Sequence, residues 1–441
     1  MAREMKNSGL PWVGKIPSDW EIKRLKYAAD YFYKGNGITK DEVFEDGDIY
    51  CIRYGEIYSK YNGAFVNCIS RTKLMVQESP RHIKKGDILF ACTGELVEEI
   101  GKNIVYMGDN PCLVGGDIIV MRHQQDPIFM NYALNSYAQT QKSEGKAKLK
   151  VVHISSKDIQ NLMVLLPTLP EQKAIADFLD SKCAEIDGLL ADLEAEVKTL
   201  SEYKKSIISE VTTQGLNQNV KKKQSGIDWV GNIPAHWQVV PFRSYVVERT
   251  EKNLGGRNKN LLALSFALGV TRYADKKYNM DRVKDDFSGY QIVHEKDLVL
   301  SPNDIIKGSI FVSEYKGCIS PMYRVFSNYD PETYNLYYLS YHLRTKESGR
   351  KFFYIARGLI GEILDNGKYV TRRMSVSQQD LLKFKVLLPP IEEQNEIVRY
   401  LDEKCAAIEQ SIADKLTQIE TLKSYKSSLI YEYVTGKKQV I

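Results

Sequence analysis

The sequence lacks any apolar run that approaches the roughly 20 residues needed to span a membrane, and residues 1–6 lack the apolar core of a secretory signal. We therefore expect a cytoplasmic protein. Its seven cysteines and six histidines are scattered, without the Cys-x-x-Cys or paired-histidine spacing of zinc sites. This pattern favours free thiols buried in a reducing compartment over a disulfide framework or a metal centre.

Motifs that bind nucleotides or methyl donors are also missing. The Gly-Lys pairs at Gly101 and Gly436 lack the glycine five positions earlier that a phosphate loop requires. Lys40 stands where the segment that begins at Gly35 would need the third glycine of a dinucleotide fingerprint. No Asn/Asp-Pro-Pro-aromatic stretch, the signature of amino-methyltransferases, occurs. We therefore expect a chain that binds rather than catalyses, with no catalytic residue, metal or cofactor of its own.

The most prominent feature that is present is a long stretch without internal proline, from Pro170 to Val211. Pro170 suits the first turn of a helix, where its missing N–H is not needed. Apolar residues recur every seven positions, which predicts a helix about 60 Å long with one apolar seam. We assign the first seam position to Leu179, Ile186, Leu193, Leu200 and Ile207, and the second to Ile175, Leu189 and Tyr203.

The partner of this helix is found later in the same chain. The same number of residues separates Gln172 from Gln394, Cys183 from Cys405, and Tyr203 from Tyr425. A shared Leu-Pro opening that ends in Glu-Gln, followed by Leu-Asp-x-Lys-Cys-Ala, indicates an internal duplication. The equivalent seam residues of the second helix are Leu401, Ile408, Leu422 and Leu429. Because the first helix leaves the first domain and the second must return, we expect an antiparallel pair.

The duplication includes the start of a globular domain ahead of each helix. The motif Trp-Val-Gly-x-Ile-Pro-x-x-Trp occurs at Trp12–Trp20 and again at Trp229–Trp237. These segments hold all four tryptophans of the chain, which we interpret as anchors of proline-bearing loops rather than as stacking partners of bases. Strand patterns at 48–54 and 87–91 and a helical pattern at 127–137 predict mixed domains.

We predict an α+β (mixed α/β) fold with two globular domains, separated by two long antiparallel helices and related by pseudo-twofold symmetry. The predicted boundaries are 1–166 for the first domain, 167–213 for the first helix, 214–226 for a linker, 227–388 for the second domain, 389–436 for the second helix and 437–441 for a tail. Between the repeated motifs the two domains differ almost everywhere. This divergence suggests one task that is performed on two different targets.

Basic segments with interleaved aromatic residues lie just ahead of each helix. Our candidates for contact with a phosphate backbone or with base edges are Lys146, Lys148 and Lys150 in the first domain and Arg357, Lys368, Arg372 and Arg373 in the second. A solvated surface is the alternative for each segment. The net charge of +5 permits an anionic partner without requiring one.

Together, these features resemble the specificity subunits of type I restriction-modification enzymes. The resemblance covers nearly the whole chain and rests on the two tryptophan motifs and on the two helix starts that end in Gln172 and Gln394. The segments Gly35–Lys40 and Gly86–Phe90 are also similar to that family. The second half departs from the pattern, since Lys296 replaces Gly86 and no Gly-x-Gly matches the segment at Gly35.

The resemblance implies two target recognition domains, each of which reads one half of a split site in double-stranded DNA. It also implies two modification subunits, which dock on the helices and carry the methyl donor site for adenine methylation. Restriction subunits join to cut DNA, so methyl donor and nucleotide are expected on partner subunits. A pseudo-symmetric reader with unlike domains should recognise two unlike half-sites, separated by an unread gap of about one helical turn.

Two alternatives from other classes stay open at this point. The chain could be a self-contained DNA nuclease or methyltransferase, which methylation by the purified chain alone would reveal. It could instead be a coiled-coil scaffold that binds only proteins, in which case the assembled complex would show no DNA sequence preference.

Overall fold

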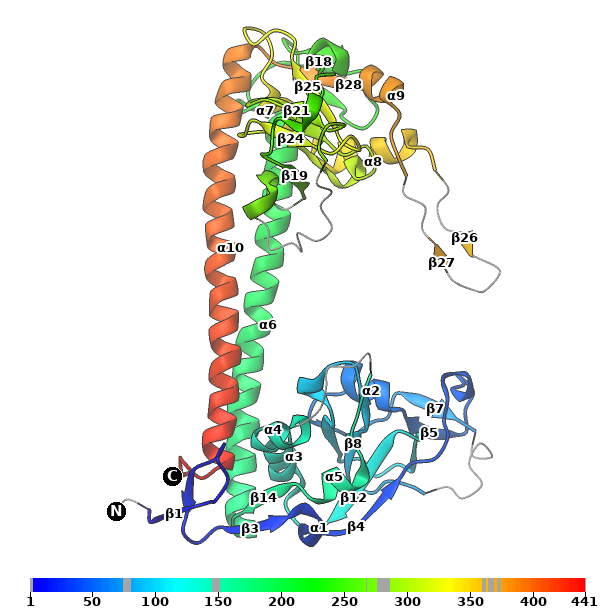
Figure 1. Ribbon diagram of the computed structural model, residues 1–441, viewed down its shortest axis with the longest axis vertical. Coiled ribbons are helices and arrows are strands. Elements are labelled where there is room, and N and C mark those ends of the chain that lie inside the picture. The colour runs from blue at the N-terminus through cyan, green and yellow to red at the C-terminus, as the bar shows by residue number, and fades with distance from the viewer. Residues whose placement is uncertain are drawn as a thin grey trace. The chain divides into compact units, whose positions relative to one another are not determined.

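The structure, a computed structural model, describes residues 3–73, 81–144, 151–266, 268–275, 286–358, 362–363, 369–370 and 374–440 (Figure 1). The chain divides into two units: unit 1 comprises Met1–Glu194 and Thr417–Ile441, and unit 2 comprises Ala195–Leu416. The division runs through both long helices, so each unit holds one globular domain together with a segment of each helix. Among the described residues, no helix is both long and apolar enough to cross a membrane.

Unit 1 is a mixed domain that leads into the long helix α6. Its strands are β1 (Met5–Asn7), β2 (Lys15–Pro17), β3 (Glu21–Arg24), β4 (Ala29–Lys34), β5 (Ile49–Ile52), β6 (Ala64–Phe65), β7 (Ser70–Thr72), β8 (Ile88–Ala91), β9 (Thr93–Gly94), β10 (Asn103–Tyr106), β11 (Cys112–Val114), β12 (Ile118–His123), β13 (Val152–His153) and β14 (Met163–Leu166). Its helices are α1 (Leu25–Ala28), α2 (Tyr54–Ser59), α3 (Pro127–Asn135), α4 (Tyr137–Ser143), α5 (Ser156–Gln160) and α6 (Leu169–Gln214).

The main sheet of unit 1 has the strand order β4-β12-β8-β10-β6, and a smaller sheet has the order β11-β5-β7. Strand β8 is fully buried and contributes to two cores. Ile88 and Phe90 pack with helices α3 and α4, whereas Leu89 and Ala91 face the side that carries β5 and α2. The alternation of a strand explains this division, because successive side chains point to opposite faces.

Unit 2 repeats this arrangement with a different periphery. Its strands are β15 (Lys222–Gln224), β16 (Asn232–Pro234), β17 (Gln238–Pro241), β18 (Val246–Glu248), β19 (Leu262–Ser265), β20 (Gly269–Arg272), β21 (Gln291–Val293), β22 (Leu298–Leu300), β23 (Ile310–Val312), β24 (Gly317–Ile319), β25 (Arg324–Asn328), β26 (Glu362–Ile363), β27 (Tyr369–Val370) and β28 (Lys385–Leu388). Its helices are α7 (Leu336–Leu343), α8 (Lys346–Ile355), α9 (Gln378–Lys383) and α10 (Ile391–Val434). Its central sheet has the order β18-β25-β22-β23.

The segment predicted as a linker, 214–226, is not wholly irregular. Its residues Lys222–Gln224 form β15, which pairs antiparallel with β16 as β1 pairs with β2. The repeated frame of unit 2 therefore begins before the second tryptophan motif. A three-residue strand with all side chains exposed carries no hydrophobic alternation, so sequence patterns could not reveal it.

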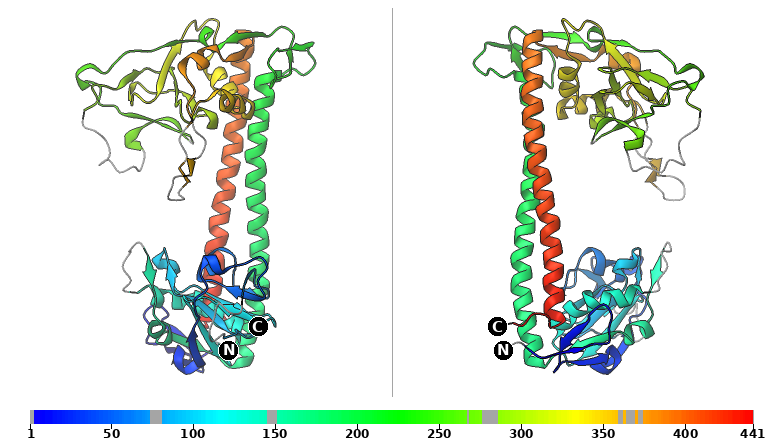
Figure 2. Two further views of the ribbon diagram at one scale, coloured as in Figure 1. Left: turned by 90° about the vertical axis from the view of Figure 1, so that its right-hand side faces the viewer. Right: turned by 60° about the vertical axis from the view of Figure 1, so that its left-hand side comes forward.

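Within each unit, α6 and α10 lie side by side and run antiparallel (Figures 1 and 2). At the predicted first seam position, Leu179, Ile186, Ile207, Leu401, Ile408 and Leu429 are buried, and Leu193, Leu200 and Leu422 are partly buried. The predicted second position is wrong beyond Ile175, because the side chains of Leu189 and Tyr203 are 53% and 52% exposed. Cys183, Leu190, Val197 and Val211 are buried or partly buried instead. In a heptad the second seam position can lie three or four residues after the first. The side on which the partner helix lies decides which of these two positions is buried.

Three ion pairs join the two helices, and each uses a lysine at a seam position. The pairs are Lys426 with Asp187, Lys204 with Glu409, and Lys415 with Glu196. Lys426 and Lys204 are equivalent in the duplication, as are Asp187 and Glu409. The lysine side chains are only 22–24% exposed, so their alkyl stems cover apolar surface while the ammonium groups reach a carboxylate.

Each long helix is attached to its own domain by a buried glutamine in its first turn. Gln172 donates to the carbonyl oxygen of Pro167 (2.9 Å) and accepts a hydrogen bond from the amide of Asp126 (3.0 Å), the N-cap of α3. Gln394 likewise donates to the carbonyl of Pro389 (2.8 Å) and accepts from the amide of Asn335 (2.8 Å), the N-cap of α7.

Trp20 and Trp237 are structural, as expected. The indole N–H of Trp20 donates to Glu171 (3.2 Å), and that of Trp237 donates to Glu393 (2.9 Å). Both indole rings are buried. Trp20 contacts Phe129 of α3 edge-on, and Trp237 contacts Tyr338 of α7 in the same way. The predicted α+β class, with two globular domains and two long helices, is confirmed.

Replacing Gln172 by alanine should lower the free energy of unfolding by about 1–3 kcal/mol, since it leaves buried backbone groups without partners. Gln394→Ala should have a similar effect. Denaturant unfolding followed by circular dichroism measures both, with the exposed Gln410 changed to alanine as the control. Equal stability of Gln172→Ala and Gln410→Ala would contradict the role given to the buried amide.

Candidate nucleic-acid interface

Of the seven cations predicted to contact DNA, only Arg357 lies among the described residues. Its side chain is 84% exposed, and Nη2 lies 3.8 Å from Oδ2 of Asp380. Its backbone is fixed by a pair of hydrogen bonds with Ser375, of 2.9 and 3.0 Å. The other candidates, Lys146, Lys148, Lys150, Lys368, Arg372 and Arg373, lie outside the described residues.

The structure brings together exposed tyrosines and cations in unit 1 that the sequence analysis missed. Tyr31 on β4 is 46% exposed, and the guanidinium carbon of Arg122 lies 5.1 Å from the centre of its ring. Tyr27 is 69% exposed, with Nζ of Lys26 4.9 Å from its ring centre. Such rings offer stacking surfaces beside positive charge. The neighbouring Lys26-Tyr27 pair was the one signal available in the sequence.

A buried aspartate follows the same turn in both units. Asp87 forms an ion pair with Arg122 (2.6 Å), and Asp297 forms one with Arg249 (2.7 Å). Asp87 raises the pKa of Arg122, since the carboxylate stabilises the charged guanidinium. Arg122 belongs to β12, whereas Arg249 follows β18, so the two units neutralise an equivalent buried charge from different strands.

The substitution of Lys296 for Gly86 leaves this turn unchanged. Gly86 has φ 88° and Lys296 has φ 67°, so both residues adopt the left-handed conformation that glycine tolerates best. In each unit the aspartate that follows accepts a hydrogen bond from a backbone amide three residues earlier, that of Lys84 or His294. The departure from the family pattern therefore lies in the residue type and not in the backbone.

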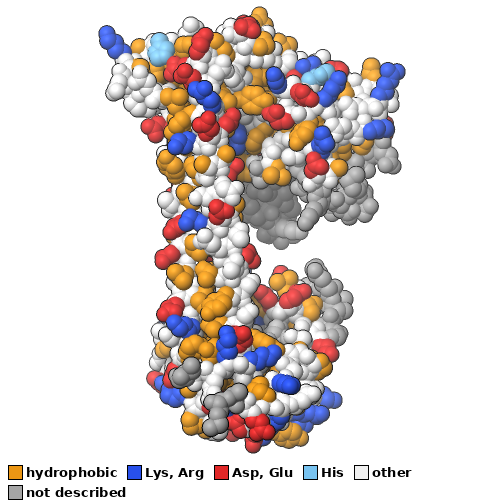
Figure 3. All heavy atoms as spheres, turned by 90° about the vertical axis from the view of Figure 1, so that its left-hand side faces the viewer, with side chains coloured by type: hydrophobic (Ala, Val, Ile, Leu, Met, Phe, Trp, Pro, Cys, Tyr) orange, Lys and Arg blue, Asp and Glu red, His pale blue; other side chains and the backbone are white. Residues whose placement is uncertain are grey.

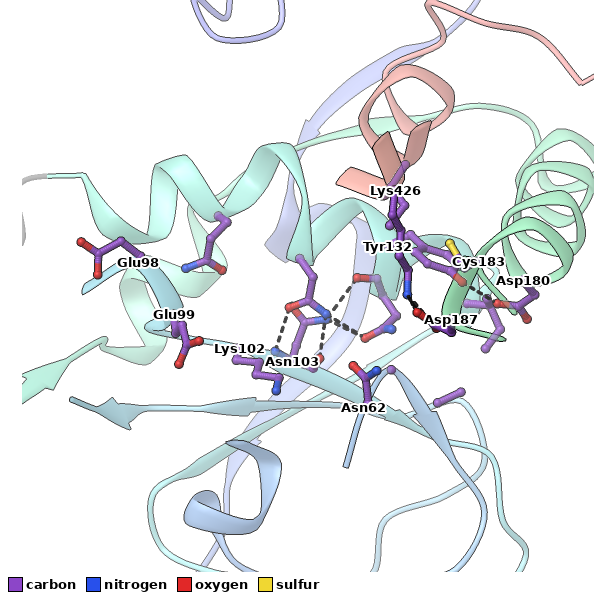
Figure 4. A pocket seen from close by; sticks show the side chains of 17 residues that line it. Asn62, Glu98, Glu99, Lys102, Asn103, Tyr132, Asp180, Cys183, Asp187 and Lys426 are labelled. Atoms are coloured by element: carbon purple, nitrogen blue, oxygen red, sulfur yellow. Dashed lines mark hydrogen bonds and ion pairs between the residues drawn. The ribbon is translucent and has the colours of Figure 1, made fainter. Parts of the chain in front are cut away.

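A polar pocket of about 500 Å³ lies in unit 1 beside α3, α6 and α10 (Figure 4). Tyr132 donates to Asp180 (2.8 Å), and Lys426 donates to Asp187 (2.6 Å), so these carboxylates already have partners. No group of three or more potential metal ligands occurs in the described part of the chain. The contacts of this pocket join the domain to the helices.

A buried lysine contacts Asn103, one of the residues that line this pocket. Lys142 is 1% exposed and donates to the carbonyl of Gly101 and to the amide oxygen of Asn103, both at 2.8 Å. Both acceptors are neutral, so burial lowers the pKa of Lys142 well below its usual value.

The cysteines have the environment of structural residues. All seven are buried and free, as expected from the sequence. Burial raises the pKa of Cys51 and of Cys92 to about 12. Both thiols are therefore protonated near neutral pH and are poor nucleophiles.

The outward faces of α6 and α10 form a second candidate surface. On the face drawn in Figure 3, hydrophobic side chains alternate with basic and acidic ones along the helices. Tyr203 and Tyr425 are equivalent in the duplication, and their side chains are 52% and 55% exposed. Large aromatic side chains that are exposed on a helix surface are typical anchors of protein interfaces.

The family model described as Type I restriction modification DNA specificity domain matches residues 17–199 and 269–420 of the chain. The chain belongs to this family. As a type I restriction-modification specificity subunit it is a non-catalytic DNA-recognition chain, which confirms the resemblance inferred from the repeated motifs.

Curated relatives match this specificity subunit over nearly its whole length. The type I restriction enzyme MjaVIII specificity subunit of Methanocaldococcus jannaschii is 24% identical, and the alignment covers 97% of this chain and 94% of the relative. The StySPI specificity subunit of Salmonella potsdam is 22% identical, and the alignment covers 93% of this chain and 88% of the relative.

Two solved structures have a similar fold. A chain from a study of the assembly and conformational transition of the type I R-M system aligns with a TM-score of 0.68 at 16% identity, and covers 96% of this chain and 99% of that one. The HsdS subunit from Thermoanaerobacter tengcongensis aligns with a TM-score of 0.51 at 16% identity, over 98% of this chain and 100% of that one.

The buried Lys142 predicts a pH-dependent stability of the specificity subunit. Burial lowers the pKa of the native lysine well below the value of about 10.4 that the unfolded one has, so between these two pKa values the unfolded state binds more protons. Stability should therefore rise with pH between the native pKa and 10.4, by up to about 1.4 kcal/mol per pH unit. Unfolding at pH 7.5 and 9.5 should show a smaller rise for Lys142→Met than for the wild type. The exposed Lys157, changed to methionine, is the control, and equal slopes in all three proteins would contradict the prediction.

Proposed function

We propose that this specificity subunit reads an asymmetric, bipartite site in double-stranded DNA, one half-site with each unit. The observation that carries the proposal is that the two units share the contacts that attach each domain to its long helix but differ in their surfaces. Both units keep the tryptophan–glutamate hydrogen bond and the buried glutamine at the helix start. Their sheets and their cation–aromatic pairs differ, as expected of two readers with different targets.

The DNA-contacting residues proposed from the sequence, including Arg357, keep that role in this proposal. Exposed arginines and lysines supply sequence-independent affinity through phosphates, whereas a smaller set of side chains reads base edges. Two unlike domains in one chain favour two unlike half-sites over a palindrome, because each domain carries its own set of contacts.

We further propose that the paired helices dock two modification subunits, which supply adenine methylation. The duplication supports this number, since equivalent outward faces occur once in each unit. Tyr203 and Tyr425 are the aromatic members of these faces. Lys198, Glu202, Gln418 and Lys423, all of them exposed, are the charged and polar members. Restriction subunits would join the same complex.

The first test concerns activity. The purified chain with labelled methyl donor should transfer no methyl group to DNA, whereas the complex with its modification subunits should methylate one bipartite motif. Methylome sequencing of DNA treated with the complex identifies that motif. Methylation by the chain alone would favour a self-contained methyltransferase, and a complex without sequence preference would favour a protein-binding scaffold.

The second test concerns stoichiometry. Tyr203→Ala should weaken the binding of one modification subunit, Tyr425→Ala that of the other, and the double variant both, each by about 2 kcal/mol or more if the tyrosine is an anchor. Native mass spectrometry counts the bound subunits. Tyr354→Ala, at a 79% exposed tyrosine on α8, is the matched control. Two subunits retained by the double variant at the affinity of the wild type would place the docking surface elsewhere.

A further inference from the structure

A second pocket of unit 1 has a composition suited to an anion. It has a volume of about 360 Å³ and is lined by three short segments, 38–40, 53–55 and 115–116. These segments lie beside β5 and β11 of the smaller sheet, which is the part of unit 1 remote from α6 in Figure 1. We call it the glycine-walled pocket, because Gly55, Gly115 and Gly116 form much of its wall.

Close backbone packing builds this wall. The amide of Gly35 donates to the carbonyl of Ile118 and that of Gly115 to the carbonyl of Ile52, both at 2.9 Å. A side chain at Gly35 would collide with the carbonyl oxygens of Gly115 and Val114. Glycine is therefore required where the segment that begins at Gly35 crosses the end of β11.

The charges on the described residues that line the pocket are positive. Lys40 and Arg53 are the charged members of this lining, and none of its described members carries a carboxylate. Of the neighbouring carboxylates, Glu42 accepts from the amide of Thr39 (2.7 Å), and Glu56, which pairs with Arg53 at 3.8 Å, accepts from Lys60 (2.9 Å) and from the backbone amide of Arg53 (3.0 Å).

The guanidinium group of Arg53 has N–H donors that can bind a ligand. Its Nη2 lies 3.8 Å from Glu56, beyond hydrogen-bond distance, and its Nε is buried without a partner. A guanidinium with unused N–H groups beside a second cation suits a phosphate group, which accepts several charge-assisted hydrogen bonds. The exposed hydroxyl-bearing residues Tyr54 and Thr39 also line the pocket, and Ile38 is its aliphatic side chain.

The second unit does not reproduce this lining. Ser320-Pro321 follows β24 where Gly115-Gly116 follows β11. The parallel pairing of Leu261 with Cys318 matches that of Cys51 with Leu113, which places Ala263 at the position of Arg53. A proline in place of a wall glycine and an alanine in place of the arginine remove the features that suit an anion.

We propose that the glycine-walled pocket binds one backbone phosphate of double-stranded DNA at the half-site read by unit 1. This inference rests on the proposed DNA-reading function and adds to it a named contact that unit 2 does not share. Arg53 holds the phosphate oxygens with its planar N–H groups, and Lys40 adds charge at the rim. The contact positions DNA without reading a base.

The charge at the pocket can be varied at Gly55 without disturbing the fold. A side chain there meets no atom within 4 Å, and its φ lies outside the left-handed region. In the complex with modification subunits, Gly55→Glu should bind DNA more weakly than Gly55→Gln, and Gly55→Lys more tightly. The dependence of log K on log salt should become about one unit less steep with glutamate and one unit steeper with lysine.

A second experiment locates the phosphate. Duplexes that carry the motif of the complex are made with one neutral methylphosphonate at a time. At one position in the first half-site, the methylphosphonate should weaken DNA binding by the wild-type complex. The same methylphosphonate should have little further effect on DNA binding by the Arg53→Ala complex. Arg53→Lys should retain part of the affinity, and Lys157→Ala is the surface control. Arg53→Ala should weaken binding to specific and unrelated duplexes by the same factor.

Three outcomes would overturn the phosphate site while leaving the proposed function intact. They are equal affinity across the Gly55 series, no methylphosphonate position that is coupled to Arg53, and a loss of preference at one base pair in Arg53→Ala. The last would make Arg53 a base reader. A wild-type complex without any sequence preference would instead contradict the proposed function itself.

Discussion

A buried amide at the start of each long helix is the contact on which the rest of each unit depends. Gln172 and Gln394 both donate to the backbone carbonyl of a proline just ahead of the helix and accept from the N-cap residue of a second helix. A glutamine can do both because its side chain carries a donor and an acceptor. Glutamate would lack the donor, and an apolar residue would leave two buried backbone groups unpaired. The direction in which each helix leaves its domain follows from this geometry.

The helix pair is held by a mixed seam rather than by a continuous apolar one. Lys204, Lys415 and Lys426 occupy seam positions, and each reaches a carboxylate on the opposite helix. Partly exposed pairs of this kind contribute little net free energy, about 0–1 kcal/mol each. Their effect is on register, since a shift of one helix along the other would leave the lysines without partners. Lys415, whose equivalent in the first helix is Leu193, makes this register specific to the pairing of α6 with α10.

The two units show how one frame can carry two surfaces. The turn before Asp87 and Asp297 is the same, even though a lysine replaces a glycine in the second unit. The arginine that neutralises the aspartate comes from a different strand in each unit. Buried elements are thus constrained by hydrogen bonding and charge neutralisation, whereas the cations and aromatic rings at the periphery are free to differ. That division is what the proposed reading of two different half-sites requires.

The sequence by itself determined the duplication, the two long helices, the mixed class of the domains and the family, because repeated motifs and heptad spacing are local patterns. It also determined that Trp20 and Trp237 are anchors, since each recurs in the same proline-bearing motif. Only the tertiary structure decided which second position of the seam is buried, because Leu189 and Leu190 both fit the period and the partner helix selects one. Only the structure brought Lys40, Arg53 and Gly115 to one pocket, because Arg53 and Gly115 lie far apart in the chain and meet through the parallel pairing of β5 with β11.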